Sequence, residues 1–297
     1  MKLFAPKYYK DFKCIAERCR HSCCIGWEID VDGAAMEKYS MLSGGYGEEI
    51  RKSIDTDGVP HFRLGAGERC PHLDEKGLCR IITEMGEGYL CDICREHPRF
   101  YNNTALGKEV GLGMACEEAC RIILSSDSYA EMTVIGEVSG EIETDFDVLP
   151  YRKKIFSILS NGSLSFSEKL LVAASEHGLD LDARTDGQWR EIISSLEYLD
   201  EARRELFLCY SSHPQPPKSL EKPLERALAY FVYRHCSSAE NKADFRASLG
   251  FCLVLTALLA SLVSGTTGEI TELARIVSEE IEYSEDNVEL IKQEFWF

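Results

Sequence analysis

The spacing of hydrophobic and polar positions changes character at about Pro150. Beyond it, apolar residues recur at the three- and four-residue intervals of amphipathic helices. The segment 165–178 is the clearest case. It opens with Ser165 and Glu168, which have the spacing of a capping box, and it ends at Gly178. This half of the chain is therefore predicted to be a helical bundle.

The remaining helices are predicted from the same periodicity. They are expected at 188–210, 220–236, 239–263, and in segments that begin at 269 and 285. Residues 211–219 contain three prolines, which cannot continue a helix, so this stretch is predicted to be a linker. The apolar run from Leu249 to Val263 is shorter than the roughly 20 residues of a membrane span, and Thr256 and Ser261 interrupt it. It is predicted to be a buried core helix.

The first half of the chain lacks such periodicity. Glycine-rich pieces such as "SGGYGEE" and "RLGAGERC" indicate loops, and no strand alternation of convincing length is present. The predicted fold class is mainly α. A Cys-rich, metal-binding module of short helices and loops (1–150) is expected to pack on an all-helical domain (151–297).

Composition narrows the possible partners. With 44% hydrophobic and 28% charged residues among 297, the chain is that of a folded globular protein. A formal net charge of −17 argues against nucleic acid and against a membrane surface as partners, and it favours a cationic protein surface or a lysine-bearing substrate. The first residues lack the apolar core of a signal peptide, so a cytoplasmic, reducing location is expected.

Cysteines are concentrated in the first half of the chain. Ten of the thirteen precede residue 121: Cys14, Cys19, Cys23, Cys24, Cys70, Cys79, Cys91, Cys94, Cys116 and Cys120. Disulfides, buried thiols and metal ligands are the three alternatives. A chain of this length does not need disulfides to fold, and the expected compartment disfavours them. Cys209, Cys236 and Cys252, and also Cys120, are predicted to be buried core thiols because they lie on apolar helical faces.

The spacing of the other cysteines indicates a metal centre. Thiolates suit both zinc and iron–sulfur clusters. Only Cys91 and Cys94 form the CxxC pair common in zinc sites, whereas the adjacent Cys23 and Cys24 point in different directions and do not easily chelate one small ion. This favours an iron–sulfur cluster, with zinc as the alternative. His72 and His97 adjoin cysteines, but such a histidine is more often a hydrogen-bonding or surface residue than a ligand.

The motifs resemble a known family. "CRHSCC", "CPHLDEKGLCR" and "CREHPRF" are similar to the motifs of the CxxxCxxCC zinc- or iron-chelating proteins. Within that group, "FKCIAERCRHSCCIGWEIDVD" is most similar to flagellin lysine-N-methylase, and the similarity continues through "YLCDICREHPRFYN" and "MACEEACRIIL". It covers roughly residues 10–125 with specific motifs and the helical remainder only weakly.

This resemblance implies transfer of a methyl group from S-adenosylmethionine to lysine side chains of flagellin by a protein that carries a [4Fe–4S] cluster. The family's metal-binding cysteines fall on Cys14, Cys19, Cys23, Cys24, Cys70, Cys79, Cys94 and Cys116. Cys91 and Cys120 lie outside the pattern. Glu117 stands where the family has a proline, which is a small departure.

The residues themselves do not indicate where the methyl donor binds. No strand is followed by a glycine-rich methyltransferase loop, "GLGMAC" (111–116) is better interpreted as a turn, and the CxxxCxxC spacing of radical S-adenosylmethionine enzymes is absent. Catalytic and cofactor-binding residues therefore stay unassigned. A non-catalytic metal-binding module and a redox protein that uses the cluster or the Cys23–Cys24 pair are the competing functions.

A lysine-methylating site needs an apolar wall and a group that removes the proton of the lysine ammonium. The aromatic residues near the cysteine motifs fit either such a wall or an ordinary core: Trp27, Tyr89, Phe100 and Tyr101. The acids Asp30, Asp32 and Asp92 are possible bases, although loop acids are common. Arg95 and Arg99 flank Cys94, and either could neutralise a cluster or hold a cofactor carboxylate.

Overall fold

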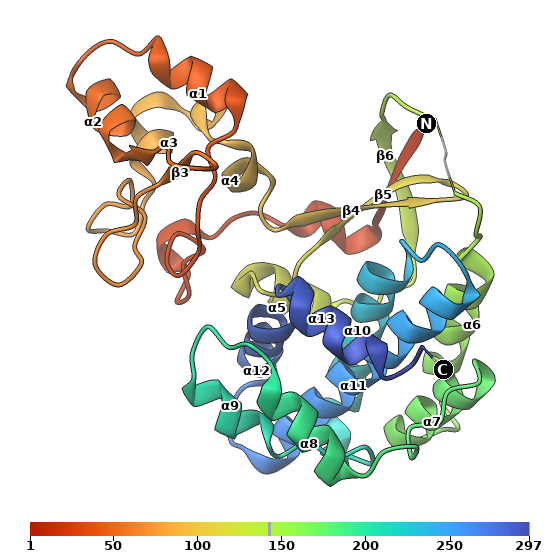
Figure 1. Ribbon diagram of the computed structural model, residues 1–297. Helices are drawn as coiled ribbons and strands as arrows, with labels where there is room; N and C mark the ends of the chain where they lie inside the picture. The colour runs from red at the N-terminus through yellow and green to blue at the C-terminus, as the bar shows by residue number, and fades with distance from the viewer. Residues whose placement is uncertain (142–143, 297) are drawn as a thin grey trace. The chain divides into compact units, whose positions relative to one another are not determined.

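The computed structural model describes residues 1–141 and 144–296, which form two compact units (Figure 1). The larger unit contains Met1–Phe12 and Arg99–Phe297, and the smaller unit is the segment Lys13–Pro98. The chain thus leaves the larger unit after Phe12 and returns to it at Arg99. This division does not coincide with the boundary predicted at residue 150, because residues 99–148 supply strands and a helix to the larger unit.

A four-stranded mixed sheet belongs to the larger unit, with the strand order β4-β5-β1-β6. The strands are β1 (Lys2–Pro6), β4 (Arg99–Thr104), β5 (Gly107–Leu112) and β6 (Met132–Glu137). β4 and β5 form an antiparallel hairpin, whereas β1 pairs in parallel with β5 and antiparallel with β6. The sequence did not predict this sheet, because its strands are short and pair across long separations.

Helices make up the rest of the larger unit. They are α5 (Glu117–Ser125), α6 (Leu149–Leu159), α7 (Phe166–Glu176), α8 (Asp186–Ser195), α9 (Ala202–Phe207), α10 (Glu221–Phe231), α11 (Lys242–Gly265), α12 (Ile270–Val277) and α13 (Glu285–Gln293). The prediction of a mainly helical chain is confirmed, since about 51% of it is helical. The proline-rich stretch 211–219 joins α9 to α10, as its composition predicts.

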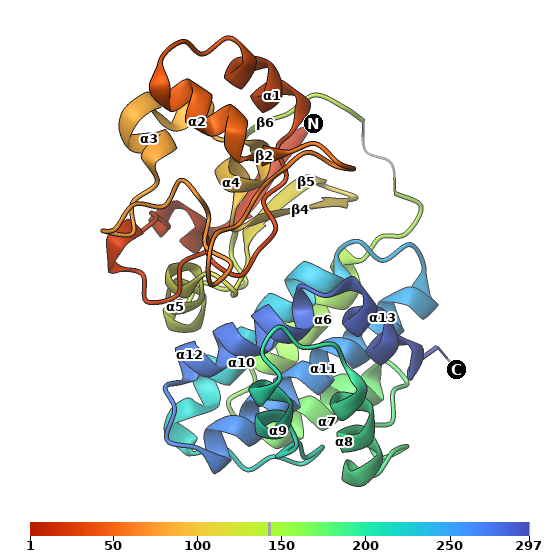
Figure 2. The same ribbon diagram turned by 60° about the vertical axis from the view of Figure 1, so that its left-hand side comes forward.

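The helix α11 forms the centre of the larger unit. It packs against α7, α9, α10, α12 and α13, and both views show it among these helices (Figures 1 and 2). By length and composition α11 could cross a membrane, but 94% of its most apolar window is buried inside the structure. The prediction of a buried core helix is confirmed. The capping box of α7 is also present, because Ser165 accepts from the Glu168 N–H and Glu168 accepts from the Ser165 N–H.

Buried charges in the larger unit pair with opposite charges, apart from Glu280, whose carboxylate accepts from the Leu199 N–H at 2.7 Å. Glu109 on β5 receives two hydrogen bonds of 2.7 Å from the guanidinium of Arg152 on α6. The ammonium of Lys169 on α7 lies 2.6 Å from a carboxylate oxygen of Glu225 on α10. The first pair joins the sheet to α6, and the second joins α7 to α10. Because both pairs are buried, removal of one partner would leave an unpaired charge in the core and destabilise the unit.

A third buried charge lies where two helices end in π-helical turns, η5 (Val232–Cys236) and η6 (Ser278–Glu282). The Glu282 carboxylate accepts from Tyr230 at 2.6 Å, and it lies 2.8 Å from Arg234 Nε and 3.1 Å from His235 Nε2. Burial opposes ionisation of Glu282, but Arg234 and His235 outweigh it and lower its pKa to about 2.

The smaller unit has a core of its own, which contains Ile29, Val31, Tyr39, Ile50 and Phe62. Its short elements are η2 (Ala16–Arg18), α1 (Gly33–Ser40), α2 (Gly45–Ser53), β2 (Ile54–Asp55), β3 (His61–Phe62), α3 (Arg80–Met85), η3 (Glu87–Tyr89) and α4 (Asp92–Glu96). Loops join these elements, as the glycine-rich composition predicts.

Candidate metal centre

Five cysteines of the smaller unit surround one core. Cys70 and Cys91 are buried in it, and Cys24, Cys79 and Cys94 are partly buried against it. Two main-chain hydrogen bonds bring the first two segments together: the Cys70 N–H donates to the Cys24 carbonyl at 2.8 Å and the Gly26 N–H to the Glu68 carbonyl at 3.0 Å. Residues far apart in the sequence thus meet in one place.

A tight turn connects Cys70 to Cys79. Leu73 forms an isolated β-bridge with Cys79, and the Asp74 carboxylate accepts from the N–H groups of Lys76 and Leu78 at 2.8 Å. Gly77 has a φ of 79°, a left-handed conformation that glycine adopts without strain. Cys70 and Cys79, at the two ends of this turn, both belong to the same core.

Cys79 and Cys91 occupy the positions that precede helices α3 and α4. The backbone N–H groups at the start of a helix favour a thiolate over a thiol. Cys91 and Cys94 share an S–H···S hydrogen bond with 3.6 Å between their sulfurs. This bond lowers the pKa of Cys91, while the same bond and burial raise that of Cys94.

The five thiols influence one another electrostatically. Burial and the nearby Cys24, Cys79 and Cys91 raise the pKa of Cys70 to about 12. Burial also raises the pKa of Cys79, with Cys24 and Cys91 adding to the effect. Mutual repulsion of this kind requires that the sulfurs lie close together. Among residues 1–141 and 144–296, however, no group of three or more Cys, His, Asp or Glu side chains is already arranged to hold a metal ion.

Cys24 differs from its neighbours. Hydrogen bonds with Cys23 and Ser22 and the charge of Arg69 offset its burial and lower its pKa to about 7. Arg69 is thus a cation next to a candidate ligand, although no cysteine motif of the sequence includes it. Of the other cysteines of this loop, Cys14 and Cys23 are exposed, and Cys19 is half-buried like Cys24.

The remaining candidate ligand, Cys116, belongs to the larger unit, where it precedes helix α5. Cys120 on α5 is fully buried, and its thiol donates to the Thr271 carbonyl at 3.3 Å. Cys236 and Cys252 are also buried, with their sulfurs 3.9 Å apart. The prediction of core thiols is confirmed for these three. It is wrong for Cys209, which is exposed because α9 ends at Phe207.

His72 has a structural role. Its imidazole is fully buried, with Nε2 2.9 Å from the Ser53 hydroxyl and Nδ1 3.3 Å from the Tyr46 hydroxyl. Both ring nitrogens are therefore occupied, and burial lowers the His72 pKa to about 4. His72 is therefore a hydrogen-bonded residue of the core. This agrees with the expectation that a histidine beside a cysteine motif is more often a hydrogen-bonding residue than a ligand.

The candidate base Asp32 joins two helices instead. Its carboxylate accepts from the Ala35 N–H of α1 at 2.9 Å and from the Asp92 N–H of α4 at 2.7 Å. Burial opposes the charge, but these N–H groups outweigh it and lower the pKa of Asp32. A carboxylate held in this way is a weak proton acceptor. Asp92 forms an ion pair with Arg95, and Asp30 forms a β-bridge with His61.

The flanking arginines and aromatic residues divide between the units. Arg95 pairs with Asp92 and Glu96 in the smaller unit. Arg99 belongs to the larger unit, where its Nε donates to the Tyr9 hydroxyl at 2.8 Å. Phe100 packs on Tyr230 and Tyr233 as a core aromatic.

Three other aromatic residues named from the sequence remain. Tyr101 is 45% exposed on β4 beneath Lys108. Trp27 and Tyr89 are half-buried in the smaller unit. The turn predicted for "GLGMAC" is present only in its second half, because Gly111 and Leu112 are the last residues of β5. Gly111 leaves room there for the rings of Phe100 and Tyr233.

Comparison with known proteins supports the resemblance that the motifs suggest. The chain is 28% identical over 183 residues to proteins named "Lysine-N-methylase" from Salmonella choleraesuis (strain SC-B67) and Salmonella typhimurium (strain LT2). The match covers 57% of this chain and 44% of each relative, so the chain spans less than half their length. It is also 27% identical over 137 residues to "Flagellar biosynthetic protein FliU" of Salmonella muenchen, of which 79% is covered.

No protein-family model and no solved structure matches the chain. The similarity therefore rests on the curated sequences, whose matches cover 57% and 42% of this chain. Together with the cysteine motifs, they confirm the predicted resemblance of this chain to the lysine-N-methylase family.

Proposed function

We propose that this chain takes part in the S-adenosylmethionine-dependent methylation of flagellin lysines, and that its smaller unit binds a [4Fe–4S] cluster. Two observations support the proposal. The lysine-N-methylase relatives support the reaction, and the "Flagellar biosynthetic protein FliU" relative supports a flagellar substrate. The shared core of Cys24, Cys70, Cys79, Cys91 and Cys94 supports the metal centre and is the structural observation that carries it.

The donor chemistry of this core fits a cluster better than it fits a set of structural thiols. Sulfurs that repel one another's charge are unfavourable to ionise together unless a cation lies among them. A bound cluster supplies that positive charge, and with it redox-active and Lewis-acidic iron. Cys24, Cys70, Cys79 and Cys94 are the ligands that both the resemblance and this core favour. Cys14, Cys19, Cys23 and Cys116 are candidates from the resemblance alone.

The substrate must lose a proton before it can accept a methyl group, because an ordinary lysine has a pKa of about 10.4. The net charge of −17 attracts a lysine-rich protein surface and increases the rate of encounter at low ionic strength. Asp32 is a poor candidate for the proton acceptor, since its carboxylate already serves two helices.

Metal content and methyl transfer should be measured separately. The protein is purified without oxygen, and its iron, sulfide and zinc are determined for the wild type and for Cys70→Ser, Cys94→Ser and Cys209→Ser. Cys209 is the matched control, because it is an exposed thiol of the other unit. We expect iron with equimolar sulfide in the wild type and in Cys209→Ser, and loss of both in the other two variants. Zinc without iron would overturn the cluster.

The reaction is then tested with labelled S-adenosylmethionine and purified flagellin. We expect label on flagellin lysines from the cluster-loaded protein. Absence of label from a protein that contains its full iron and sulfide would contradict the methylation and leave the metal centre standing.

One observation favours a second function, thiol–disulfide exchange. The 3.6 Å between the sulfurs of Cys91 and Cys94 permits a disulfide after a small rotation. With glutathione disulfide as oxidant, the two thiols form one S–S bond, and their two protons and two electrons convert the oxidant to two glutathione thiols. Mass spectrometry of the metal-free protein after exposure to glutathione disulfide tests this. Failure to detect the Cys91–Cys94 disulfide would exclude it.

A further inference from the structure

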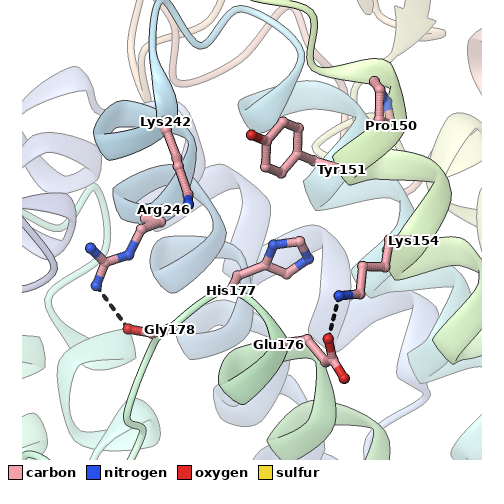
Figure 3. A pocket seen from close by; sticks show the side chains of 8 residues that line it. All are labelled: Pro150, Tyr151, Lys154, Glu176, His177, Gly178, Lys242 and Arg246. Atoms are coloured by element: carbon pink, nitrogen blue, oxygen red, sulfur yellow. Dashed lines mark hydrogen bonds and ion pairs between the residues drawn. The ribbon is translucent and has the colours of Figure 1, made fainter.

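A pocket of about 470 Å³ lies within the larger unit, and no cysteine is among its lining residues (Figure 3). Three segments line it: the start of α6, the end of α7 and the start of α11. Its volume falls within the roughly 300–1,000 Å³ of small-molecule sites. Neither the cysteine motifs nor the proposed methylation uses it.

Positive charge dominates the lining of this pocket. Lys154, Lys242 and Arg246 contribute three cations against the single carboxylate of Glu176. Glu176 pairs with Lys154, so Lys242 and Arg246 have no acid among the lining residues to neutralise them. The first turns of α6 and α11 add the positive ends of two helix dipoles. Such a basic surface is unusual in a chain whose net charge is −17.

Two buried nitrogen atoms at this pocket have no hydrogen-bond partner. The His177 side chain is only 8% exposed, and its Nε2 is unpaired. Nε of Arg246 is also unpaired, although Nη2 of the same guanidinium donates to the Gly178 carbonyl at 2.8 Å. Figure 3 shows the imidazole in the middle of the lining residues, directed toward Tyr151 and Lys154. Unpaired buried donors are destabilising, so a ligand that accepts from them gains affinity.

The His177 ring is held in place by its neighbours. Its centroid lies 5.5 Å from that of Phe245 and 6.0 Å from that of Tyr151, and these two rings are 5.0 Å apart. Burial and the charges of Lys154 and Lys242 lower the pKa of His177, while Glu176 opposes the shift. The imidazole is therefore neutral near pH 7 and can donate or accept at Nε2 according to its tautomer.

We propose that this pocket binds a small organic phosphate. A phosphate group offers three acceptor oxygens and close to two negative charges, which match donors from His177, Lys242 and Arg246. A carboxylate has two oxygens and one charge, so it matches these donors less well. S-adenosylmethionine carries an ammonium and a sulfonium against one carboxylate, and this excess of cations is repelled by the pocket. The inference is independent of the proposed methylation.

Binding can be measured by isothermal titration calorimetry on the full chain. Adenosine 5′-monophosphate and ribose 5-phosphate are the probes, and adenosine, ribose, citrate and S-adenosylmethionine are the comparison ligands. We expect at least one phosphate probe to bind more tightly than its dephosphorylated counterpart, than citrate and than S-adenosylmethionine. The proposal is overturned if neither probe exceeds its dephosphorylated counterpart, or if citrate binds better than both.

Variants locate the site. Lys242→Ala removes an exposed cation of the lining, and Lys153→Ala removes an exposed cation of α6 that does not line the pocket. Lys242→Ala should weaken phosphate binding about tenfold, the factor that corresponds to about 1.4 kcal/mol, and Lys153→Ala should leave it unchanged. Equal weakening by both variants would show only general attraction and would contradict a defined site.

A spectroscopic readout completes the test. In the wild type, the pKa of His177 followed by NMR should rise when the phosphate probe binds, because the anion favours the imidazolium. His177→Gln should keep the fold, as judged by circular dichroism, and reduce the affinity. An unchanged His177 pKa at saturating probe would place the phosphate elsewhere and overturn the proposal.

Discussion

The two units bury polar groups in different ways. In the larger unit, Glu109 meets Arg152, Lys169 meets Glu225, and Glu282 meets Arg234. In the smaller unit, thiols gather with other thiols: burial raises the pKa of Cys70, with nearby thiols adding to it, and the hydrogen bond with Cys91 and burial raise the pKa of Cys94. The larger unit thus supplies its own counter-charges. The smaller unit gathers a set of thiols, and Arg69 places a positive charge near one of them, Cys24.

This difference separates two reasons for burying a polar group. A fully paired charge such as Glu282 fixes one arrangement of the helices around it, and it needs no further ligand. Clustered thiols contribute little to such specificity by themselves, because the thiol is a weak hydrogen-bond donor and acceptor. Their gathering is what the proposed metal centre would account for.

If the proposed metal centre is present, its removal should change the stability of the two units more unequally than any other treatment. Treatment with a chelator and a reductant should abolish hydrogen-exchange protection in Lys13–Pro98, because binding energy at clustered thiolates contributes directly to folding. Protection of α11 in the larger unit should persist. Mass spectrometry of the exchanged peptides measures both units in one sample, and equal loss in both would show that they do not differ in this way.

Replacement of Glu282 should destabilise the larger unit and leave the smaller unit unaffected. Glu282→Gln leaves the buried Arg234 without its anion and should lower the free energy of unfolding of the larger unit by about 3–5 kcal/mol. Urea denaturation followed by circular dichroism measures it. Glu201→Gln is the control, since Glu201 pairs with Arg204 at the surface and its loss should change nothing measurable. A small effect of Glu282→Gln would mean that the buried network adds little.

Acid should destabilise the larger unit by protonating Glu282. The pKa of Glu282 is lowered from an ordinary value of 4.5 to about 2, so its stabilising contribution is complete above pH 4.5 and is lost as the pH falls toward 2. Urea midpoints at pH 7, 4 and 3 should therefore decrease in order. The decrease should be shallower in Glu282→Gln, and identical slopes in the two proteins would exclude Glu282 as the cause.

Removal of helix caps should cause the smallest losses of stability, and one cap can be removed in each unit for comparison. Ser165→Ala removes the cap of α7 and should cost about 1 kcal/mol. Asp32→Ala removes acceptors for two helices, α1 and α4, and should cost about 2 kcal/mol within the smaller unit. Ser163→Ala, an exposed position beside α7, serves as control. The difference between Asp32→Ala and Ser165→Ala should vanish if the Asp92 contact is unimportant.

Local patterns predicted much of the larger unit from sequence. The capping box at Ser165, the buried run from Leu249 to Val263 and the proline-rich connection at 211–219 each depend on neighbours in the chain, and each has its predicted role. The sheet was missed because β1 pairs with strands more than a hundred residues away. Cys209 was misplaced because apolar periodicity continues past the end of α9.

The sequence indicated which cysteines to consider for the candidate site, but it did not indicate which residues surround them. The family resemblance implied eight ligand cysteines, and four of them share a core: Cys24, Cys70, Cys79 and Cys94. Cys91 was only a secondary candidate because it lies outside the family pattern, yet it is the most buried of these thiols. The charge of Arg69 near Cys24 and the capping by Asp32 come from loop crossings that no local pattern encodes. The same holds for the pocket around His177.

The route of the chain has a consequence for how the protein can be handled. At the two points where the chain leaves and re-enters the larger unit, the Arg99 guanidinium contacts Tyr9 and lies over the ring of Phe12. The segment Lys13–Pro98 is therefore an insertion whose two ends meet at one place in the larger unit. The entropy cost of closing a loop grows only slowly with its length. Unfolding or deleting the smaller unit should therefore leave the larger unit folded. A short peptide linker that joins Phe12 directly to Arg99 would then give the larger unit by itself.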